Sequence, residues 1–352
     1  MALIRKKTGN FLDDFRLGQL FRHKGGRTVT EGITAHFTDF SFTANPLHRN
    51  LRYAQRYGYD AMPIPPGLVM AVAFSQTVED ISENARANLE YIDVRFGATI
   101  YPGDTLETQS TVLGVRGSRS RTDVGVVHVQ SVARNQRGAV AVAYQRKVQV
   151  FRADEWARLD EGEVPAQPVA VELELPSYRA RAAYAAQAHL SSTDTYFEDL
   201  APGDTLEHAR GRTLTDEHIA LTGMLDNTAQ VHCNRALIER DPERYLGGQL
   251  VVYGGIPFAL ALGLSSRDVA DNSLGDLAYR TGRHTAPMFA GDTLFATSEL
   301  VARRDCPGRP DLGILELILR GYKVEDPGPA ERRIEVFQLE RELILKRREF
   351  YV

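Results

Sequence analysis

Two segments about 185 residues apart have almost the same sequence, in a chain of 352 residues. Residues 26–31 are GRTVTE and residues 211–216 are GRTLTD. Other segments recur in the same order: NPLH at 45–48 matches AQVH at 229–232, and PGDTL at 102–106 matches AGDTL at 290–294. Solenoid repeats are far shorter than this. The chain therefore contains a duplicated domain, and one copy can keep the chemistry while the other shapes the pocket.

A length of 352 residues indicates a globular protein of two domains. A net charge of −4 argues against nucleic-acid binding, which usually needs a basic excess. The basic run at 22–27 has no interleaved aromatic residues, so we expect a solvated turn. No apolar run approaches the roughly 20 residues that cross a bilayer, and no apolar signal core follows residues 1–7. We expect a cytoplasmic protein that contacts neither nucleic acid nor membrane.

The two cysteines, Cys233 and Cys306, predict neither a disulfide framework nor a metal site. A secreted chain stabilised by disulfides would normally carry more cysteines, and the spacing does not fit zinc. Cys233 follows a histidine, but adjacency in sequence does not place a thiol against an imidazole, so we do not expect a nucleophile there.

Each half shows the same order of elements. In the first, a helix is expected at about 30–42, an apolar buried helix opens at the prolines of 63–67, and period-two strands start at 104, near 127 and at 140. Residues 135–138 predict a hairpin turn. The second half has a helix at 215–224, an apolar helix after Gly254, and strands from 292, 312 and 334. One buried helix wrapped by a long antiparallel sheet is an α+β plan, present twice.

The proline-containing and acidic region in the middle of the chain predicts a linker. The predicted organisation is an N-terminal domain at 1–152, a linker at 153–192 with a short helix at about 180–188, and a C-terminal domain at 193–352.

Several segments carry a family resemblance. Residues 42–48, FTANPLH, resemble the GDxNPxH signature loop of MaoC-like, (R)-specific enoyl-CoA hydratases. More narrowly, the chain resembles the mesaconyl-CoA (2-methylfumaryl-CoA) hydratases, also called β-methylmalyl-CoA dehydratases. The segments that carry this likeness are NLEY at 88–91, RFGA at 95–98, YPGDTL at 101–106, NTAQVH at 227–232, VYGG at 252–255 and GRHT at 282–285. The resemblance implies a double hot-dog fold over nearly the whole chain.

The same resemblance implies a hydro-lyase (EC 4.2.1) that reversibly hydrates mesaconyl-C1-CoA to β-methylmalyl-CoA in carbon metabolism. Such an enzyme needs no metal or redox cofactor, and CoA enters only as part of the thioester substrate. Two hot-dog units in one chain mimic the dimer of single-domain relatives, and a further homodimer is compatible with this plan.

The chemistry favours the second half as the site. Hydration of a 2-enoyl thioester needs a base for water, which a histidine can supply, and a helix N-terminus to stabilise the thioester oxygen as charge develops there. His232 is the candidate base, and Gly255 the candidate N–H donor at the helix start. Either Asn227 orients the water or Asp226 supplies a carboxylate, and the sequence leaves both open.

The first half offers a weaker, independent site at His48 and Asn45. The signature acid is absent there, because Thr43 occupies its position. Since the expected substrate has a free carboxylate, an arginine could hold it through two hydrogen bonds. The candidates for substrate binding are Arg283, Arg95 and Arg280, with His284 beside the first of them.

Three other functions compete with this hypothesis. A hydratase of another enoyl-CoA would keep the class and change the substrate. A hot-dog thioesterase would direct water at the carbonyl carbon and release free CoA. A non-catalytic acyl-binding module would bind CoA thioesters without turnover, and the altered acid position in both halves makes this a serious alternative.

Overall fold

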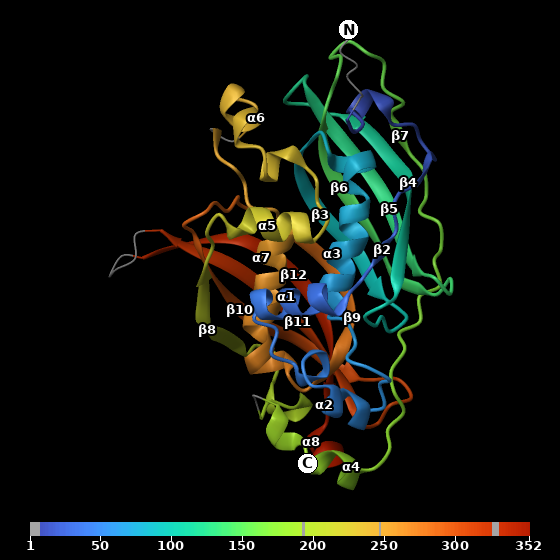
Figure 1. Cartoon of the computed structure of the whole chain (residues 1–352), viewed down its shortest axis with the longest axis vertical. Coiled ribbons are helices and arrows are strands. Elements are labelled where there is room, and N and C mark those ends of the chain that lie inside the picture. Colours follow the sequence, from blue (N-terminus) through green and yellow to red (C-terminus); the bar gives the residue numbers. More distant parts are fainter. Residues whose placement is uncertain (1–7, 192–193, 246–247, 326–330) are drawn as a thin grey trace.

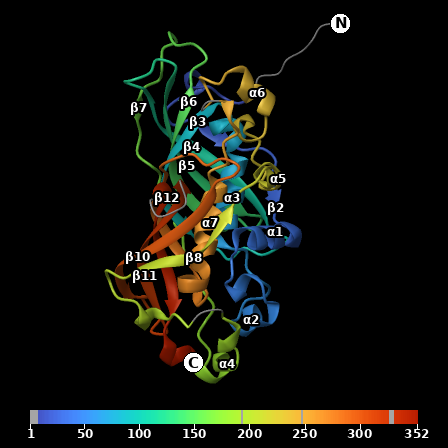
Figure 2. The ribbon, with the colours of Figure 1, turned by 90° about the vertical axis from the view of Figure 1, so that its left-hand side faces the viewer.

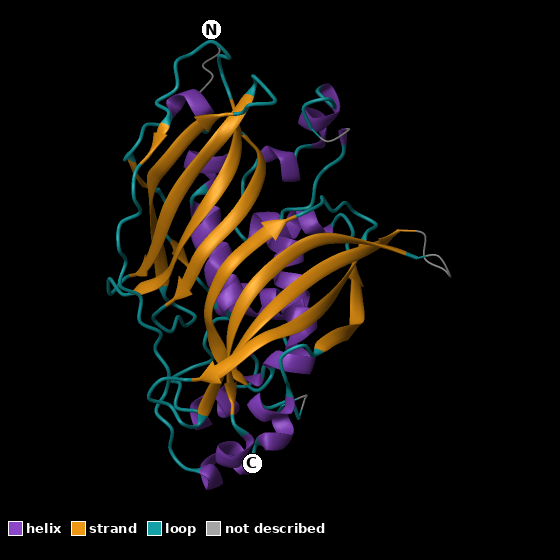
Figure 3. Cartoon of the chain, turned by 180° about the vertical axis from the view of Figure 1, so that it is seen from behind, coloured by secondary structure: helices purple, strands orange, loops and turns teal. Residues whose placement is uncertain are grey.

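A computed structural model describes residues 8–191, 194–245, 248–325 and 331–352 of the chain. Its strands form one antiparallel sheet in the order β1-β4-β5-β6-β3-β9-β12-β11-β10-β8, with β2 and β7 paired to β4 (Figure 3). The first-half strands are β1 Leu20–Arg22, β2 Arg27–Thr28, β3 Ala85–Phe96, β4 Thr105–Gly117, β5 Val124–Asn135, β6 Val140–Phe151 and β7 Gly162–Glu163. The second-half strands are β8 Thr205–Thr213, β9 Ser273–His284, β10 Thr293–Asp305, β11 Leu312–Glu325 and β12 Arg332–Lys346.

The helices gather on one face of this sheet (Figures 1 and 2). They are α1 Glu31–Ser41, α2 Leu51–Arg56, α3 Pro66–Gln76, α4 Arg181–Ala185, α5 Glu217–Met224, α6 Arg235–Arg240, α7 Gly255–Ser265 and α8 Arg348–Tyr351. Short 3-10 turns are η1 Leu12–Asp14, η2 Pro46–His48, η4 Ala188–Leu190, η5 Phe197–Asp199 and η6 Gln230–His232, and π turns η3 Val78–Ser82 and η8 Ser266–Ala270 follow α3 and α7. No described helix is long and apolar enough to cross a membrane.

The two central helices, α3 and α7, confirm the expected buried helices. Both are apolar on nearly all sides, and almost every residue in them is buried. Proline stands at the start of α3, where its missing N–H costs nothing because the first helical turn has no acceptors. The predicted hairpin between β5 and β6 also forms, with Gly138 at a φ of 81°. The duplicated α+β plan is therefore confirmed.

The sequence pattern did not reveal β3 and β9, which join the two halves. These strands pair with each other, with Tyr91 opposite Gly282 and Val94 opposite Tyr279. Their pairing with β6 and β12 is interrupted by register shifts, three in each case. A bulge breaks the alternation of side chains along a strand. The period-two pattern is therefore lost in the strands that fuse the two sheets into one.

A buried histidine ties each edge of the sheet to the turn after the central helix. His23 lies between Asp80, 2.8 Å from Nδ1, and Ser110, 2.7 Å from Nε2. In the second half His208 lies between Asp268 at 2.7 Å and Ser298 at 2.9 Å. Both imidazoles are fully buried, and none of these six residues lines a described cavity. Both copies therefore retain the same hydrogen-bonded connection between an edge of the sheet and the turn after the central helix.

The region predicted as a linker contacts the rest of the structure near both of its ends. Residues of β7 pair with β4 of the first half. Tyr184 of α4 is buried against Tyr57 and Tyr351, with ring centroids 4.8 Å away in each case. Next to these rings, the buried Lys346 donates hydrogen bonds to Tyr53 and Tyr57. The segment between the halves therefore packs as part of the structure.

A close contact between α1 and α7 predicts a stability effect. A Cβ at Gly263 of α7 would lie 1.6 Å from the backbone oxygen of Ser41, whereas a Cβ at Gly223 of α5 would meet nothing within 4 Å. We expect Gly263→Ala to destabilise the protein by about 2 kcal/mol or more through overpacking. Gly223→Ala should be neutral or stabilising by about 0.5 kcal/mol. Denaturant unfolding measures both, and equal effects would contradict the close approach of α1 and α7.

Candidate active site

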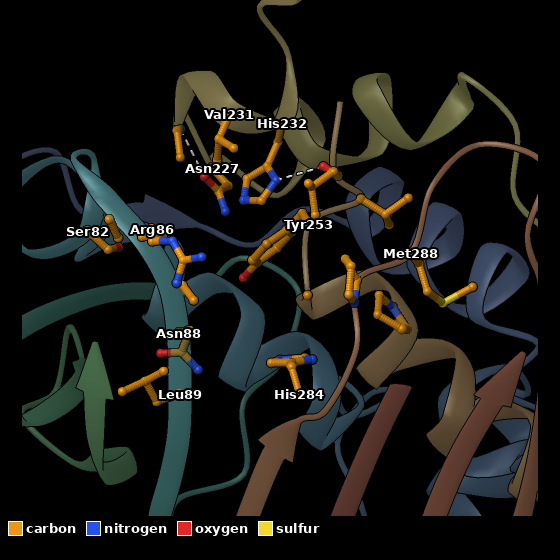
Figure 4. A pocket seen from close by; sticks show the side chains of 18 of the residues that line it. Ser82, Arg86, Asn88, Leu89, Asn227, Val231, His232, Tyr253, His284 and Met288 are labelled. Carbon is orange, nitrogen blue, oxygen red and sulfur yellow. Dashed lines mark hydrogen bonds between the residues drawn. The ribbon is translucent and has the colours of Figure 1, made fainter. Parts of the chain in front are cut away.

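A cavity with a volume of about 290 Å³ lies between the halves (Figure 4). Both halves line it. The first half contributes Phe74, Val78, Ser82, Arg86, Asn88, Tyr91 and Arg146, and the second contributes Asn227, His232, Arg244, Tyr253, Gly254, His284 and Met288. The cavity thus combines the strand residues of one copy with the loop and helix start of the other.

His232 presents an unprotonated nitrogen to this cavity. Its Nδ1 lies 2.9 Å from the backbone oxygen of Val251, and since a carbonyl only accepts, Nδ1 carries the proton. Nε2 is then a lone-pair acceptor on the cavity side (Figure 4). Burial lowers the pKa of His232 from 6.5 to about 4, so the ring is neutral near pH 7. A neutral imidazole with a fixed tautomer is suited to accept a proton.

Asn227 lies beside His232, and its amide is oriented by the backbone. Its Oδ1 accepts a hydrogen bond from the N–H of Ala229 at 3.0 Å, which leaves Nδ2 pointing into the cavity (Figure 4). The backbone N–H of Asn227 in turn donates to Thr222 at 3.1 Å. The side chain is buried, so its donor is available only to a group inside the cavity.

Asp226 does not reach the cavity. It has a positive φ of 65° two residues after the end of α5, as Phe42 does directly after α1 with 61°. Its carboxylate is half exposed and pairs with Arg27 at 3.3 Å. Of the two alternatives that the sequence left open, the structure therefore brings Asn227 to His232 and takes the neighbouring carboxylate away.

The start of α7 forms another wall, and Gly254, not the predicted Gly255, lines the cavity. Within the described part of the chain, the N–H groups of both glycines lack a backbone acceptor, as expected for a first helical turn. A Cβ at Gly254 would lie 2.7 Å from Nε2 of His284. Glycine is therefore required where His284 packs against the helix start.

His284 lies in the cavity, as the sequence suggested, at the end of β9. Burial, with a smaller effect from His232, lowers its pKa to about 4. Its Nε2 is 3.4 Å from the hydroxyl of Tyr91, a long contact. A neutral His284 can donate one hydrogen bond to a bound acyl group or accept one from it.

The arginines chosen from the sequence lie elsewhere. Arg95 is exposed and pairs with Asp93 at 2.8 Å, and the half-exposed Arg280 pairs with the buried Glu342 at 2.5 Å. Arg283 is exposed and precedes His284, so it lies on the opposite face of β9. None of the three lines the cavity.

The buried arginine of the cavity is Arg146 of β6, which sequence analysis missed. It donates to Thr77 at 2.7 Å, and its guanidinium lies 4.3 Å from the ring centre of Phe74. Its Nε has no hydrogen-bond partner, and neither amide atom of the nearby strand residue Asn88 has one. A comparison of the two halves position by position would have drawn attention to this pair.

The first-half candidates His48 and Asn45 lie in a separate cavity of only about 40 Å³. His48 is fixed by the backbone oxygen of Pro63 at 2.8 Å. The Asn45 amide nitrogen donates to Ala270 and Ser273, each at 3.1 Å, and its oxygen accepts from Leu47. These bonds use both ends of the amide, and the space left would not admit an acyl group.

Other reactive groups do not form a site. Among the described residues, no cluster of three His, Cys, Asp or Glu side chains could hold a metal. Cys233 is exposed, and partial burial of its thiol raises the pKa, which disfavours the thiolate.

Two tandem hot-dog units with a histidine loop over the buried helix define a MaoC-like double hot-dog protein. A family model described as mesaconyl-CoA hydratase matches residues 2–317. The chain is 42% identical over 313 residues to the β-methylmalyl-CoA dehydratase of Chloroflexus aurantiacus, covering 88% of this chain and 87% of that protein. It is 32% identical to the mesaconyl-CoA hydratase of Cereibacter sphaeroides over 324 residues, 91% of each.

Solved structures agree with this assignment. A MaoC domain protein of Chloroflexus aurantiacus superposes with a TM-score of 0.88 at 36% identity, covering 97% of this chain and 98% of that one. A double hot-dog protein of Mycobacterium tuberculosis shares the fold at 22% identity, with a TM-score of 0.75 and coverage of 96% and 98%. The chain belongs to the mesaconyl-CoA hydratase family.

The state of His232 predicts the acid limb of the pH profile. If its neutral imidazole is the base, kcat/KM should be constant above about pH 5 and fall as the pH drops through about 4, where the ring becomes protonated. A midpoint near 6.5, the ordinary value, would contradict a buried neutral base.

The control for this profile is folding. Because the pKa of His232 is lower in the folded than in the unfolded state, the unfolded state binds more protons between about 4 and 6.5, and stability declines as the pH falls through that window. Circular dichroism at each pH separates this loss from the loss of the base.

Proposed function

We propose that this protein hydrates mesaconyl-C1-CoA (2-methylfumaryl-CoA) reversibly to β-methylmalyl-CoA. Membership of the mesaconyl-CoA hydratase family supports this reaction. The observation that carries the proposal is the buried, unprotonated Nε2 of His232 beside the amide donor of Asn227 in an otherwise largely apolar cavity. That pair can bind one water molecule between an acceptor and a donor.

In this mechanism the water donates a hydrogen bond to Nε2 of His232 and accepts one from Nδ2 of Asn227. His232 takes the proton as the water oxygen bonds to Cβ, and the electron pair of the double bond moves toward the thioester. The imidazolium then returns its proton to Cα. One water is added, and His232 ends in its starting state, so no other acid is needed.

The thioester oxygen gains negative charge before Cα is protonated. The N–H of Gly254, which lines the cavity at the start of α7, is the donor for it in this proposal, assisted by the helix dipole. The scheme uses no metal or redox cofactor, and CoA takes part only as the carrier of the acyl group.

The CoA arm extends from the acyl cavity past Arg86 and Arg244 in this proposal. Both side chains line the cavity, and Arg86 is exposed, with a hydrogen bond to Gln149 at 3.0 Å. Their charges suit the phosphates of CoA. Further homodimerisation stays a prediction from the sequence.

Two histidine variants test the placement of the chemistry. We expect His232→Ala to lower kcat on mesaconyl-C1-CoA by about 10³-fold, since it removes the base. His48→Ala changes the matched histidine in the cavity of about 40 Å³, and it should change kcat by less than about threefold because His48 touches no reacting atom. Loss of the ultraviolet band of the enoyl thioester measures both.

The same assay separates the alternatives. Loss of activity only in His48→Ala would move the site to the first half. Release of free thiol by the wild type would indicate a thioesterase, and binding of CoA thioesters without loss of the band would indicate an acyl-binding module. Faster turnover of crotonyl-CoA than of the mesaconyl thioester would keep the hydratase class and change the substrate.

A further inference from the structure

The duplication places the same arginine in both cavities with different neighbours. Arg146 of β6 lies opposite Tyr91 of β3, and Arg341 of β12 lies opposite Tyr279 of β9. Each arginine also bonds to an equivalent hydroxyl at the end of its central helix, Thr77 for Arg146 and Ser265 for Arg341. The two arginines are therefore the same structural position in two copies.

The two arginines differ in whether a carboxylate pairs with them. In the smaller cavity, which contains His48, Asp276 of β9 accepts a hydrogen bond from Nε of Arg341 at 2.6 Å and one from the hydroxyl of Tyr279 at 2.6 Å. The equivalent residue on β3 is Asn88, three residues before Tyr91 as Asp276 is three before Tyr279, and opposite Val148 as Asp276 is opposite Leu343. The cavity of His232 thus has the neutral amide of Asn88 at the position where the cavity of His48 has the carboxylate of Asp276.

The larger cavity, which contains His232, consequently holds a buried cation without a carboxylate partner among the described residues. Arg146 is fully buried, and within the described residues no carboxylate pairs with it. Its Nε and both amide atoms of Asn88 are buried without a hydrogen-bond partner, although buried polar groups are normally paired. Arg146, Asn88 and Tyr91 all line the cavity that contains His232.

We propose that Arg146, Asn88 and the hydroxyl of Tyr91 form the receptor for the free carboxylate at the far end of the acyl chain. The bound carboxylate takes the part that Asp276 plays for Arg341 and Tyr279 in the other copy. This inference rests on the proposed function and deepens it, because it selects acyl-CoA substrates with a terminal carboxylate over those with a terminal methyl group.

Binding of two non-reacting thioesters tests the receptor without turnover. Succinyl-CoA and butyryl-CoA have acyl chains of equal length and differ in a carboxylate against a methyl group. By calorimetry we expect the wild type to bind succinyl-CoA at least about tenfold more tightly, since a buried charged hydrogen bond is among the stronger polar contacts. Equal affinities would overturn the inference.

The variant Asn88→Asp would give Arg146 the same kind of ion pair that Arg341 makes with Asp276 in the other cavity. It should weaken succinyl-CoA binding by about 30-fold, because an internal carboxylate then competes for Arg146 and repels the ligand. Butyryl-CoA binding should change by less than about threefold, which also shows that the variant is folded. Equal loss for both ligands, or no loss for either, would contradict the receptor.

Arg146→Met is the second variant, and it removes the charge while filling the space. It should abolish the preference for succinyl-CoA as Asn88→Asp does, and retention of that preference would overturn the inference. Turnover is a separate readout. If the wild type hydrates mesaconyl-C1-CoA but does not prefer succinyl-CoA, the proposed function stands and the receptor is rejected. If it prefers succinyl-CoA but does not hydrate mesaconyl-C1-CoA, the receptor stands and the proposed function is rejected.

Discussion

The pairing of β3 with β9 is the contact on which the rest of the structure depends. It turns two sheets into one and sets α3 and α7 side by side on the same face (Figure 1). As a result, each cavity receives its histidine loop and helix start from one copy and its buried arginine, with the strand residues beside it, from the other. Neither half contains a complete site, so the two units of the duplication must fold together.

The two cavities differ because their buried charges are balanced differently. In the cavity of His48, Arg341 pairs with the carboxylate of Asp276, and both ends of the Asn45 amide are hydrogen-bonded. The space that remains is only about 40 Å³. Around His232 polar atoms stay unpaired and the cavity is larger, about 290 Å³. Unsatisfied buried groups reduce stability, and folded proteins accept that cost mainly where a ligand will complete the bonds.

Much of this could be predicted from the sequence, because the evidence for it is local. The recurring segments revealed the duplication, the apolar stretches after Pro66 and Gly254 predicted the buried helices, and the loop ending at His232 indicated the site. The joining strands were missed because bulges break their alternation. Asp226 was a candidate only by its position in sequence, since a left-handed backbone that turns its carboxylate away is not visible there. Arg146 was missed because an arginine in an alternating strand resembles a solvent-facing residue.

In an assembly of two identical subunits related by a twofold axis, any substitution changes both sites at once. The covalent joining of the copies removes that restriction. The position held by Asn88 on β3 and Asp276 on β9 shows what this permits: one copy stabilises the fold through an internal ion pair, while the other gives up that bond and leaves its cation to a ligand. In a chain that contains both copies, stability and recognition can therefore be assigned to different copies of the same position.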